Sequence, residues 1–220
     1  MTTPTLIVHH LGRSQSERIV WLCEELGLDY VLDRHERRAD NRMAPPEYKA
    51  LHPIGSAPVI TDGARVLGES GAVVEYLLAT RGGGRLAPRV GDPAFADYLY
   101  WFHFANGTLQ PLVLQVWLLE RVDPSGESPV LQSARRRFDL VFSHLDQRLA
   151  RAPWLAGKDF TAADIMTVFT LTTMRLFNPF DLSPWPNILA YLQRIGARPA
   201  YRSAMRKADP DLVPLLQARP

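Results

Sequence analysis

The period of the hydrophobic pattern changes part-way along the chain, and this change constrains the fold more than any other feature. Up to about residue 81, short apolar runs typical of strands alternate with segments whose apolar residues recur every three or four positions. Beyond about residue 92, only the helical period continues. The pattern predicts an α/β domain followed by an all-α domain. Residues 82–92 contain three successive glycines and two prolines within or beside them, which is typical of a linker.

The first domain is expected to hold four strands and three helices. A strand, a helix and a second strand follow one another, which predicts a parallel pair joined by a right-handed crossover. Asp62-Gly63 between two later strands predicts an antiparallel hairpin. A small mixed sheet with flanking helices matches a thioredoxin-like arrangement. We expect strands at 5–9, 29–32, 57–60 and 64–67, and helices at 16–26, 46–51 and 69–79.

The second domain reads as helices only. A long helix begins near residue 92 and ends near Pro111, or continues after a kink to Arg121. A second runs from Ser128 to about residue 150, and Thr161-Ala-Ala-Asp164 forms a capping box before an apolar run. Two shorter helices are expected at 186–195 and 199–207. In the long helix Tyr98, Trp101, Phe102 and Ala105 share the face expected to be buried.

Composition excludes several classes of function. The 220 residues carry 25 Lys plus Arg against 23 Asp plus Glu, a balance of +2 that is too small to indicate a nucleic-acid partner. No stretch approaches the ~20 apolar residues of a membrane helix, and the N-terminus does not read as a signal peptide. One cysteine, Cys23, excludes an internal disulfide and a cysteine-based zinc site. We therefore expect a soluble, cytoplasmic protein without membrane or nucleic-acid partners.

The turn between the first strand and the first helix is the first candidate for chemistry. Ser14 and Ser16 lie in it. Serines at this place are common as helix caps or turn residues. The same place presents a hydroxyl, together with the positive end of the helix dipole, to any anion beyond the turn. Position alone leaves both interpretations open.

Two further pairs carry similar alternatives. Ala57-Pro58 opens the third strand, so the proline either marks a sheet edge or forms a cis bond. A cis bond would turn the backbone of Ala57 outward to pair with an extended peptide. Glu69-Ser70 begins a helix, either as an acid and a cap or as a pair that binds the ammonium and carboxylate groups of one ligand.

In order and spacing, these segments together resemble the soluble glutathione S-transferases. The chain is similar to bacterial-like members with a serine-type active site, as in theta-like and delta-like classes. The resemblance covers nearly the whole chain. It is carried by Ser14-Gln-Ser-Glu-Arg18, Leu22-Cys-Glu-Glu-Leu-Gly-Leu-Asp-Tyr30, the segments 46–60 and 67–77, and Trp154-Leu-Ala-Gly-Lys-Asp-Phe-Thr-Ala-Ala-Asp164.

The resemblance implies a fold and a domain plan. A thioredoxin-like, glutathione-binding domain would occupy 1–81, a linker 82–92, and an all-α domain 93–220 would form the hydrophobic co-substrate site. It implies a homodimer that takes glutathione and a small hydrophobic electrophile, with no metal ion.

The resemblance also implies site residues. Ser14 would be the catalytic hydroxyl, because tyrosine-type classes need Tyr in the first strand or turn and omega-like classes need Cys at position 14. Glutathione would bind at Ser16, His52, Ser56, Ala57, Pro58, Glu69 and Ser70. The hydrophobic substrate would contact Leu11, His103, Phe104 and Gly107.

Two positions depart from the family pattern. Many relatives have Asn at His52 and Lys at Ser56. The missing lysine removes a contact to a glutathione carboxylate, which Arg37, Arg38 or Arg42 could replace. These arginines are otherwise ordinary surface residues of a loop.

The function that the resemblance implies is detoxification by a glutathione transferase that activates the glutathione thiol as a thiolate. Two alternatives stay open: a glutathione-dependent peroxidase or isomerase on the same scaffold, and a non-catalytic member that binds glutathione or proteins. His9 and His10 are interpreted as strand residues with ordinary partners, and Cys23 as a small buried hydrophobe. Arg18 is interpreted as part of an interdomain or structural pair rather than as a ligand.

Overall fold

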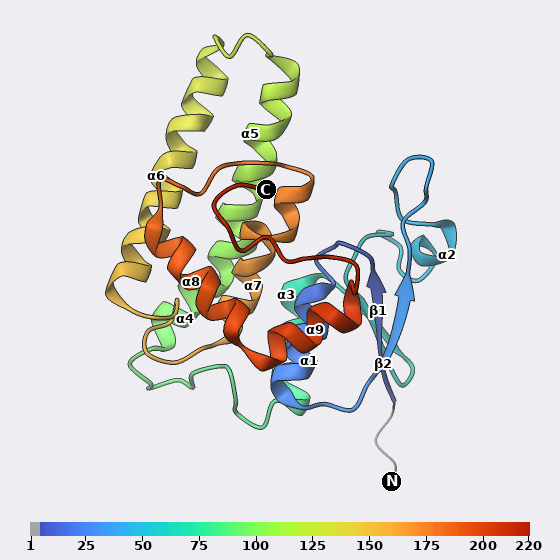
Figure 1. Cartoon of the computed structure of the whole chain (residues 1–220). Helices are drawn as coiled ribbons and strands as arrows, with labels where there is room; N and C mark the ends of the chain where they lie inside the picture. The colour runs from blue at the N-terminus through green and yellow to red at the C-terminus, as the bar shows by residue number, and fades with distance from the viewer. Residues whose placement is uncertain (1–4) are drawn as a thin grey trace. The chain divides into compact units, whose positions relative to one another are not determined.

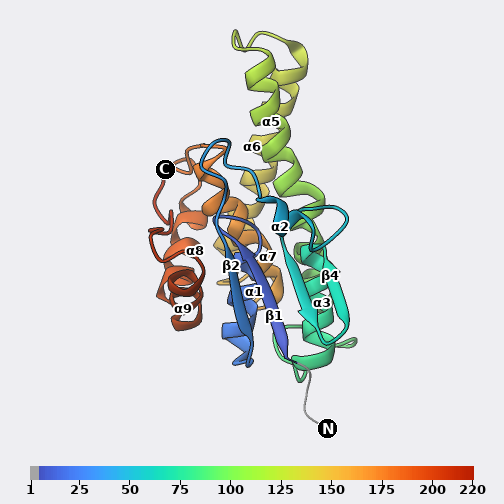
Figure 2. The ribbon, with the colours of Figure 1, turned by 90° about the vertical axis from the view of Figure 1, so that its right-hand side faces the viewer.

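Four strands form one mixed sheet in the first of two structural units (Figures 1 and 2). The computed structural model describes residues 5–220. The strands are β1 (Leu6–Leu11), β2 (Val31–His35), β3 (Val59–Asp62) and β4 (Arg65–Gly68), in the order β2-β1-β3-β4. β1 and β2 are parallel, whereas β3 is antiparallel to both β1 and β4. The predicted mixed sheet and hairpin are confirmed.

All four strands differ from their expected bounds, β1 by extending to Leu11, β4 by one residue, and β2 and β3 most. β2 was expected at 29–32 but extends through Asp33, Arg34 and His35, whose polar side chains hide the strand from a hydrophobic pattern. β3 was expected to begin at residue 57 but begins at Val59, because Pro58 has no backbone N–H to donate to the sheet.

Helices cover both faces of this sheet. α1 (Glu17–Leu26), α3 (Ser70–Arg81) and α9 (Pro199–Ala208) lie on one face, and the short α2 (Pro46–Lys49) lies on the other (Figure 1). The expected apolar face of α1 is buried, including Cys23. α1 packs along α9, where the rings of Trp21 and Tyr201 meet edge to face with centroids 4.9 Å apart.

The chain passes between the two units more than once. The first unit comprises the residues up to Ala87 together with Gly196–Pro214, and the second comprises Pro88–Ile195 with Leu215–Pro220. The boundary after Ala87 falls inside the segment expected to be a linker. The helix expected at 199–207 forms as α9, but it packs with the sheet-containing unit rather than with the helices that precede it.

The second unit is helical throughout its described residues. Its long helix continues past Pro111, as one alternative allowed: α4 (Phe95–Phe104) passes through a π-helical turn, η1 (Ala105–Leu109), into α5 (Gln110–Val122). Pro111 lacks the amide that would bond one turn back, and the wider turn accommodates this loss. The unit also contains α6 (Pro129–Arg151), α7 (Ala162–Leu171), a 3₁₀ turn η2 (Thr173–Leu176) and α8 (Pro186–Ala197).

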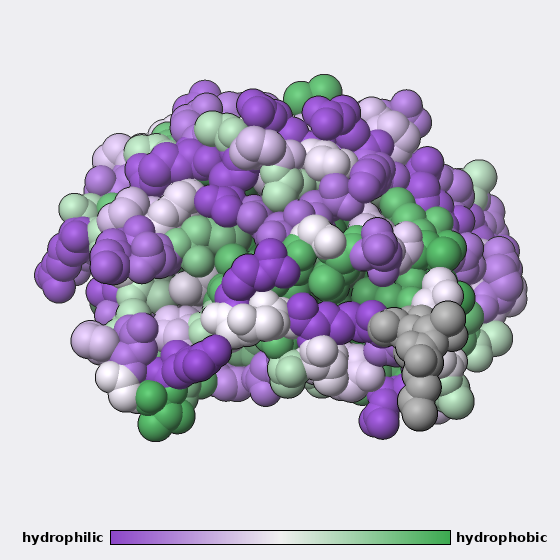
Figure 3. Space-filling view, turned by 90° about the horizontal axis from the view of Figure 1, so that it is seen from below, coloured by the Kyte–Doolittle hydropathy of each residue, from purple (hydrophilic) through white to green (hydrophobic). Residues whose placement is uncertain are grey.

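Buried residues agree with the expected faces of these helices. Tyr98, Trp101, Phe102 and Ala105 are all buried. The capping box before α7 is present, with the Thr161 amide donating to the Asp164 carboxylate at 2.9 Å. Among the described helices, none is long and apolar enough to cross a membrane. The face seen in Figure 3 carries small hydrophobic patches separated by hydrophilic residues.

Candidate active site

Three connections of the first unit leave the sheet at the same edge. β1 ends there at Leu11, and the antiparallel β3 begins there, because Val59 pairs with both His9 of β1 and Gly68 of β4. The loop after β1, the Ala57-Pro58 segment before β3 and the Glu69-Ser70 segment after β4 therefore emerge side by side. The register of the sheet brings together three segments that lie up to 56 residues apart in sequence, from Ser14 to Ser70.

The two serines of the first loop are in direct contact. Ser14 Oγ and Ser16 Oγ are 2.8 Å apart, and the Ser16 amide donates to Ser14 Oγ at 3.3 Å. Both side chains are buried, Ser14 at 5% and Ser16 at 0% exposure. Ser14 thus has the turn-stabilising role that its position predicts, and its remaining hydrogen-bonding capacity stays available to a ligand.

The loop continues directly into the first turn of α1. The amides of Glu17, Arg18 and Ile19 donate to the carbonyls of Ser14, Gln15 and Ser16, respectively. These short-range bonds begin the helix at Ser14, before the first residue of regular α-helix. The hydroxyl of Ser14 therefore lies at the positive end of the helix dipole.

Arg18 ties this loop to the start of α3. Its guanidinium donates to Gln15 Oε1 at 2.7 Å and to Ser70 Oγ at 3.3 Å. The side chain is 1% exposed. Burial lowers the pKa of Arg18 to about 9, although the negative charges of Glu17 and Glu69 act in the opposite direction and raise it. Both of these hydrogen bonds lie within the first unit, as expected of a structural role.

Glu69 precedes α3 with an unusual backbone. Its φ is +69°, a region that residues with a side chain rarely adopt. Its side chain is exposed, whereas that of Ser70 is buried. Strained backbone of this kind persists where surrounding structure fixes it, often at ligand sites.

The Ala57-Pro58 bond is cis, as one of the two alternatives held. Ala57 lies before the first paired residue of β3. Nearby, the imidazole of His52 packs against Gly68, where an added Cβ would lie 3.2 Å from the ring. Ser56 is exposed. The loop that carries four of the expected glutathione-binding residues therefore ends at the same sheet edge as Ser14.

A contact that the sequence did not predict, between His10 and Asp209, lies behind the serines. His10 Nδ1 is 2.9 Å from Ser16 Oγ, and His10 Nε2 is 3.1 Å from Asp209 Oδ2. Asp209 follows α9, 199 residues from His10, and also accepts from the Arg13 amide at 2.9 Å. No local pattern could have revealed this contact, because it depends on α9 packing beside α1.

His9, the neighbour of His10, points to the opposite face of the sheet. Its ring lies 2.8 Å from Asp33 Oδ2 and 2.9 Å from Thr61 Oγ1. Asp33 also bonds with His35 at 2.9 Å. His9 thus has partners in neighbouring strands, whereas His10, also a β1 residue, has its partners in Ser16 and Asp209.

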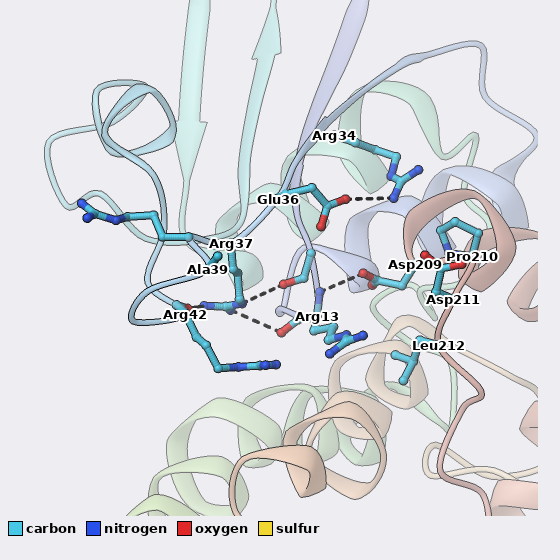
Figure 4. Close-up of a pocket in the computed structure, with 12 residues that line it drawn as sticks. Arg13, Arg34, Glu36, Arg37, Ala39, Arg42, Asp209, Pro210, Asp211 and Leu212 are labelled. Carbon is cyan, nitrogen blue, oxygen red and sulfur yellow. Dashed lines mark hydrogen bonds and ion pairs between the residues drawn. The ribbon is translucent and has the colours of Figure 1, made fainter.

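A basic cavity of about 210 Å³ opens beside the loop (Figure 4). The Arg37 guanidinium projects into it and donates to the carbonyls of Gly12, Arg13 and Arg42. Arg38 pairs with Asp40 through two hydrogen bonds. Of the three candidates for a carboxylate ligand, Arg37 therefore supports the backbone next to Ser14, and Arg38 has an acidic partner.

The residues expected at the hydrophobic substrate site fall in different surroundings. His103, Phe104 and Gly107 line an open pocket of about 490 Å³ in the second unit, together with Leu99, Tyr100 and Thr108. Phe104 is nevertheless mostly buried. Leu11 belongs to the first unit, where its side chain packs in an apolar cluster with Tyr48 and Val59.

Comparisons with known proteins agree with this geometry. Residues 13–80 match the family model "Glutathione S-transferase, N-terminal domain", and residues 109–199 match "Glutathione S-transferase, C-terminal domain". A solved glutathione S-transferase of Actinobacillus pleuropneumoniae is 33% identical, with a TM-score of 0.85 over 93% of both chains. Glutathione S-transferase 3 of Schizosaccharomyces pombe is 29% identical over 96% of this chain and 90% of its own. A theta class enzyme of Xanthomonas axonopodis, solved with glutathione bound, is 26% identical, with a TM-score of 0.69 over 91% of this chain and 97% of its own.

Proposed function

The chain belongs to the glutathione S-transferase family, and from this membership we propose that it activates the thiol of glutathione through the Ser14 hydroxyl. The enzyme is a glutathione transferase. Its co-substrate in the proposal is a small hydrophobic electrophile, which the thiolate attacks. No metal ion takes part.

The placement of the Ser14 hydroxyl carries the proposal. It lies at the N-terminal turn of α1 and within 2.8 Å of Ser16 Oγ, at the sheet edge where Ala57-Pro58 and Glu69-Ser70 also emerge. A free thiol has a pKa of about 8.5. Lowering it by about two units requires about 2.7 kcal/mol. A hydrogen bond to a charged group, at about 1.5–3 kcal/mol, and a helix-dipole contribution of about 0.3–1 kcal/mol are sufficient.

The remaining residues of the first unit would hold the tripeptide. The Ala57 backbone would pair with its cysteinyl unit, and Glu69 and Ser70 would hold its γ-glutamyl end. His52, Ser56 and Pro58 would shape the loop along which it lies. Ser16 would serve indirectly, because its hydroxyl is fully buried and already engaged with Ser14 and His10.

The domain plan and setting are part of the same proposal. Residues 1–81 would bind glutathione, 82–92 would link the domains, and 93–220 would bind the electrophile around His103, Phe104 and Gly107, with Leu11 contributing from the first. Residues 1–4 of this plan lie outside the described residues. A cytoplasmic homodimer is the proposed form, and sedimentation of the purified protein measures its mass directly.

Replacing Ser14 with alanine separates chemistry from binding. We expect Ser14→Ala to lower the rate of thiol addition to an activated aryl halide by at least tenfold, because the thiolate loses its donor. Glutathione affinity should change by less than threefold, since the backbone and Glu69-Ser70 contacts remain. Equal losses in rate and affinity would make Ser14 a binding residue only.

A further inference from the structure

The buried groups behind Ser14 form one continuous hydrogen-bonded chain within the first unit. It runs from Ser14 Oγ to Ser16 Oγ (2.8 Å), on to His10 Nδ1 (2.9 Å), and from His10 Nε2 to Asp209 Oδ2 (3.1 Å). His10 and Ser16 are 0% exposed, and Asp209 is 8% exposed. No step of the chain needs water.

Asp209 fixes the proton at one end of this chain. Burial raises the pKa of Asp209, but hydrogen bonds from His10 and the Arg13 amide, with the charges of these residues, outweigh it and lower the pKa overall. An ionised carboxylate can only accept hydrogen bonds. The Nε2 atom of His10 must therefore carry a proton and donate it to Asp209. It follows that Nδ1 is protonated only when His10 is an imidazolium.

The protonation state of His10 determines which way the hydrogen bond between Ser16 and Ser14 points. A serine hydroxyl has one proton and two lone pairs. One lone pair accepts from the Leu11 amide at 3.1 Å. The remaining lone pair and the proton serve His10 and Ser14, the Leu11 carbonyl at 3.4 Å being the longer alternative for the proton. When His10 is neutral, Ser16 donates to it and accepts from Ser14; when His10 is charged, Ser16 accepts from it and donates to Ser14.

The direction of the hydrogen bond between Ser14 and Ser16 determines whether Ser14 can donate a hydrogen bond to a ligand or only accept one. In the first arrangement the Ser14 proton points to Ser16, so its oxygen can only accept from outside. In the second arrangement Ser14 accepts from Ser16, and its proton is free to be donated outward. Two hydroxyl oxygens 2.8 Å apart need a proton between them, which excludes Ser14 donating outward while Ser16 donates to His10.

We propose that His10, held by Asp209, is the terminal acceptor of the glutathione thiol proton. This proposal rests on the proposed function and deepens it. The thiol S–H bond breaks as its proton joins Ser14 Oγ; the Ser14 proton moves to Ser16 Oγ, and the Ser16 proton moves to His10 Nδ1. The products are a thiolate, hydrogen-bonded by Ser14, and an imidazolium paired with the Asp209 carboxylate. The thiolate attacks the electrophile, and the proton returns along the same path to the expelled anion.

Other charged groups surround His10 and must be counted in any pH profile. Arg34 is the β2 partner of His10 in the sheet register. Arg13 on the first loop, Arg37 and Glu36 after β2, and Asp211 after α9 line the cavity next to Asp209 (Figure 4). Of the side chains with a described hydrogen bond to the His10 ring, Asp209 is the charged one.

Counting protons tests the relay. Glutathione is bound at pH 7.5 in two buffers of different ionisation enthalpy, and calorimetry gives the protons released while ultraviolet absorbance gives the thiolate formed. For the wild-type protein we expect fewer than 0.3 protons released per thiolate, in order-of-magnitude terms, because His10 retains the proton. One proton released per thiolate would overturn the relay.

Matched variants separate the relay from a structural role. His10→Asn keeps a polar atom near Nδ1 but cannot hold the proton, and we expect it to lower the thiolate fraction at pH 7 by about tenfold, one pKa unit. Asp209→Asn keeps the shape of the pair and should act in the same direction. His9→Asn, which alters a buried histidine of the same strand facing the opposite side, should match the wild type. An unchanged thiolate fraction in both relay variants would refute the proposal while leaving Ser14 activation intact, whereas a normal thiolate in Ser14→Ala would refute the proposed function itself.

Discussion

Ser14 and Ser16 are one residue apart, yet their surroundings differ. The hydroxyl of Ser16 contacts His10, Leu11 and Ser14, whereas the described contacts of the Ser14 hydroxyl are with Ser16 alone. Sequence position could place Ser14 in a turn, Ser70 at the start of a helix and Ala57-Pro58 before a strand, because caps, turns and prolines act over a few residues. It could not identify His10, whose partner Asp209 is distant in sequence. At the scale of single residues, local structure was predictable and long-range pairing was not.

Replacing Arg18 should lower both the stability of the protein and its affinity for glutathione. Arg18→Met keeps the volume but leaves Ser70, Gln15 and the charge of Glu69 without their cation. We expect the free energy of unfolding to fall by about 2 kcal/mol, typical of losing buried hydrogen bonds from a charged group, and glutathione to bind at least several-fold more weakly. Urea unfolding and calorimetry measure the two effects.

Arg81→Met provides the control for this prediction. Arg81 ends α3 and pairs with Asp62 at 2.6 Å, at the far end of the helix from Ser70. The Arg81→Met variant should have a lower free energy of unfolding but an unchanged affinity for glutathione. An equal loss of affinity in both variants would show that Arg18 acts through stability alone.

Whole elements were easier to predict than their ends. The helices at 16–26, 128–150 and 199–207 appear within one or two residues of their expected limits, because caps and apolar periodicity act together. β2 was displaced, since its polar residues bond with one another and with His9 of β1 rather than packing in a hydrophobic core. The π-helical turn before α5 followed from Pro111 only as one alternative, because a proline near the start of a helix is compatible with a break, a kink or a wider turn.

Asp164, in the capping box of α7, should make the free energy of unfolding depend on pH. Burial raises the pKa of Asp164 from 3.8 to about 6, despite hydrogen bonds from Leu155, Thr161 and Tyr191. Because the folded pKa is above the unfolded one, the unfolded state loses its proton first as pH rises. Stability due to this group is therefore full below about pH 4 and is lost by about pH 6, a change of about 3 kcal/mol.

Asp164→Asn removes this titration and isolates the effect. Asparagine keeps an acceptor for the Leu155 amide but has no proton to lose. The difference in unfolding free energy, wild type minus variant, should fall by roughly 3 kcal/mol between pH 4 and 6 in urea titrations. A difference that is constant or rises across this range would contradict the raised pKa.

At the scale of the whole molecule, the path of the chain matters as much as its division into domains. The change of hydrophobic period identified an α/β region and a helical region, and the family resemblance gave both folds. Neither showed that 196–214 returns to the first unit. That return places α9 along α1 and Asp209 behind His10. The end of the chain is thus part of the surroundings of a residue at its beginning, which a reading along the sequence cannot reveal.

The central claim is that the folded protein converts bound glutathione from thiol to thiolate at neutral pH, and one titration tests it most directly. Ultraviolet difference absorbance of glutathione bound to the wild-type protein, followed from about pH 5 to 9, reports the fraction of thiolate without any electrophile. We predict a bound-thiol pKa of about 6–7, roughly two units below that of a free thiol. A bound thiol that titrates near its free value of about 8.5 would contradict the account.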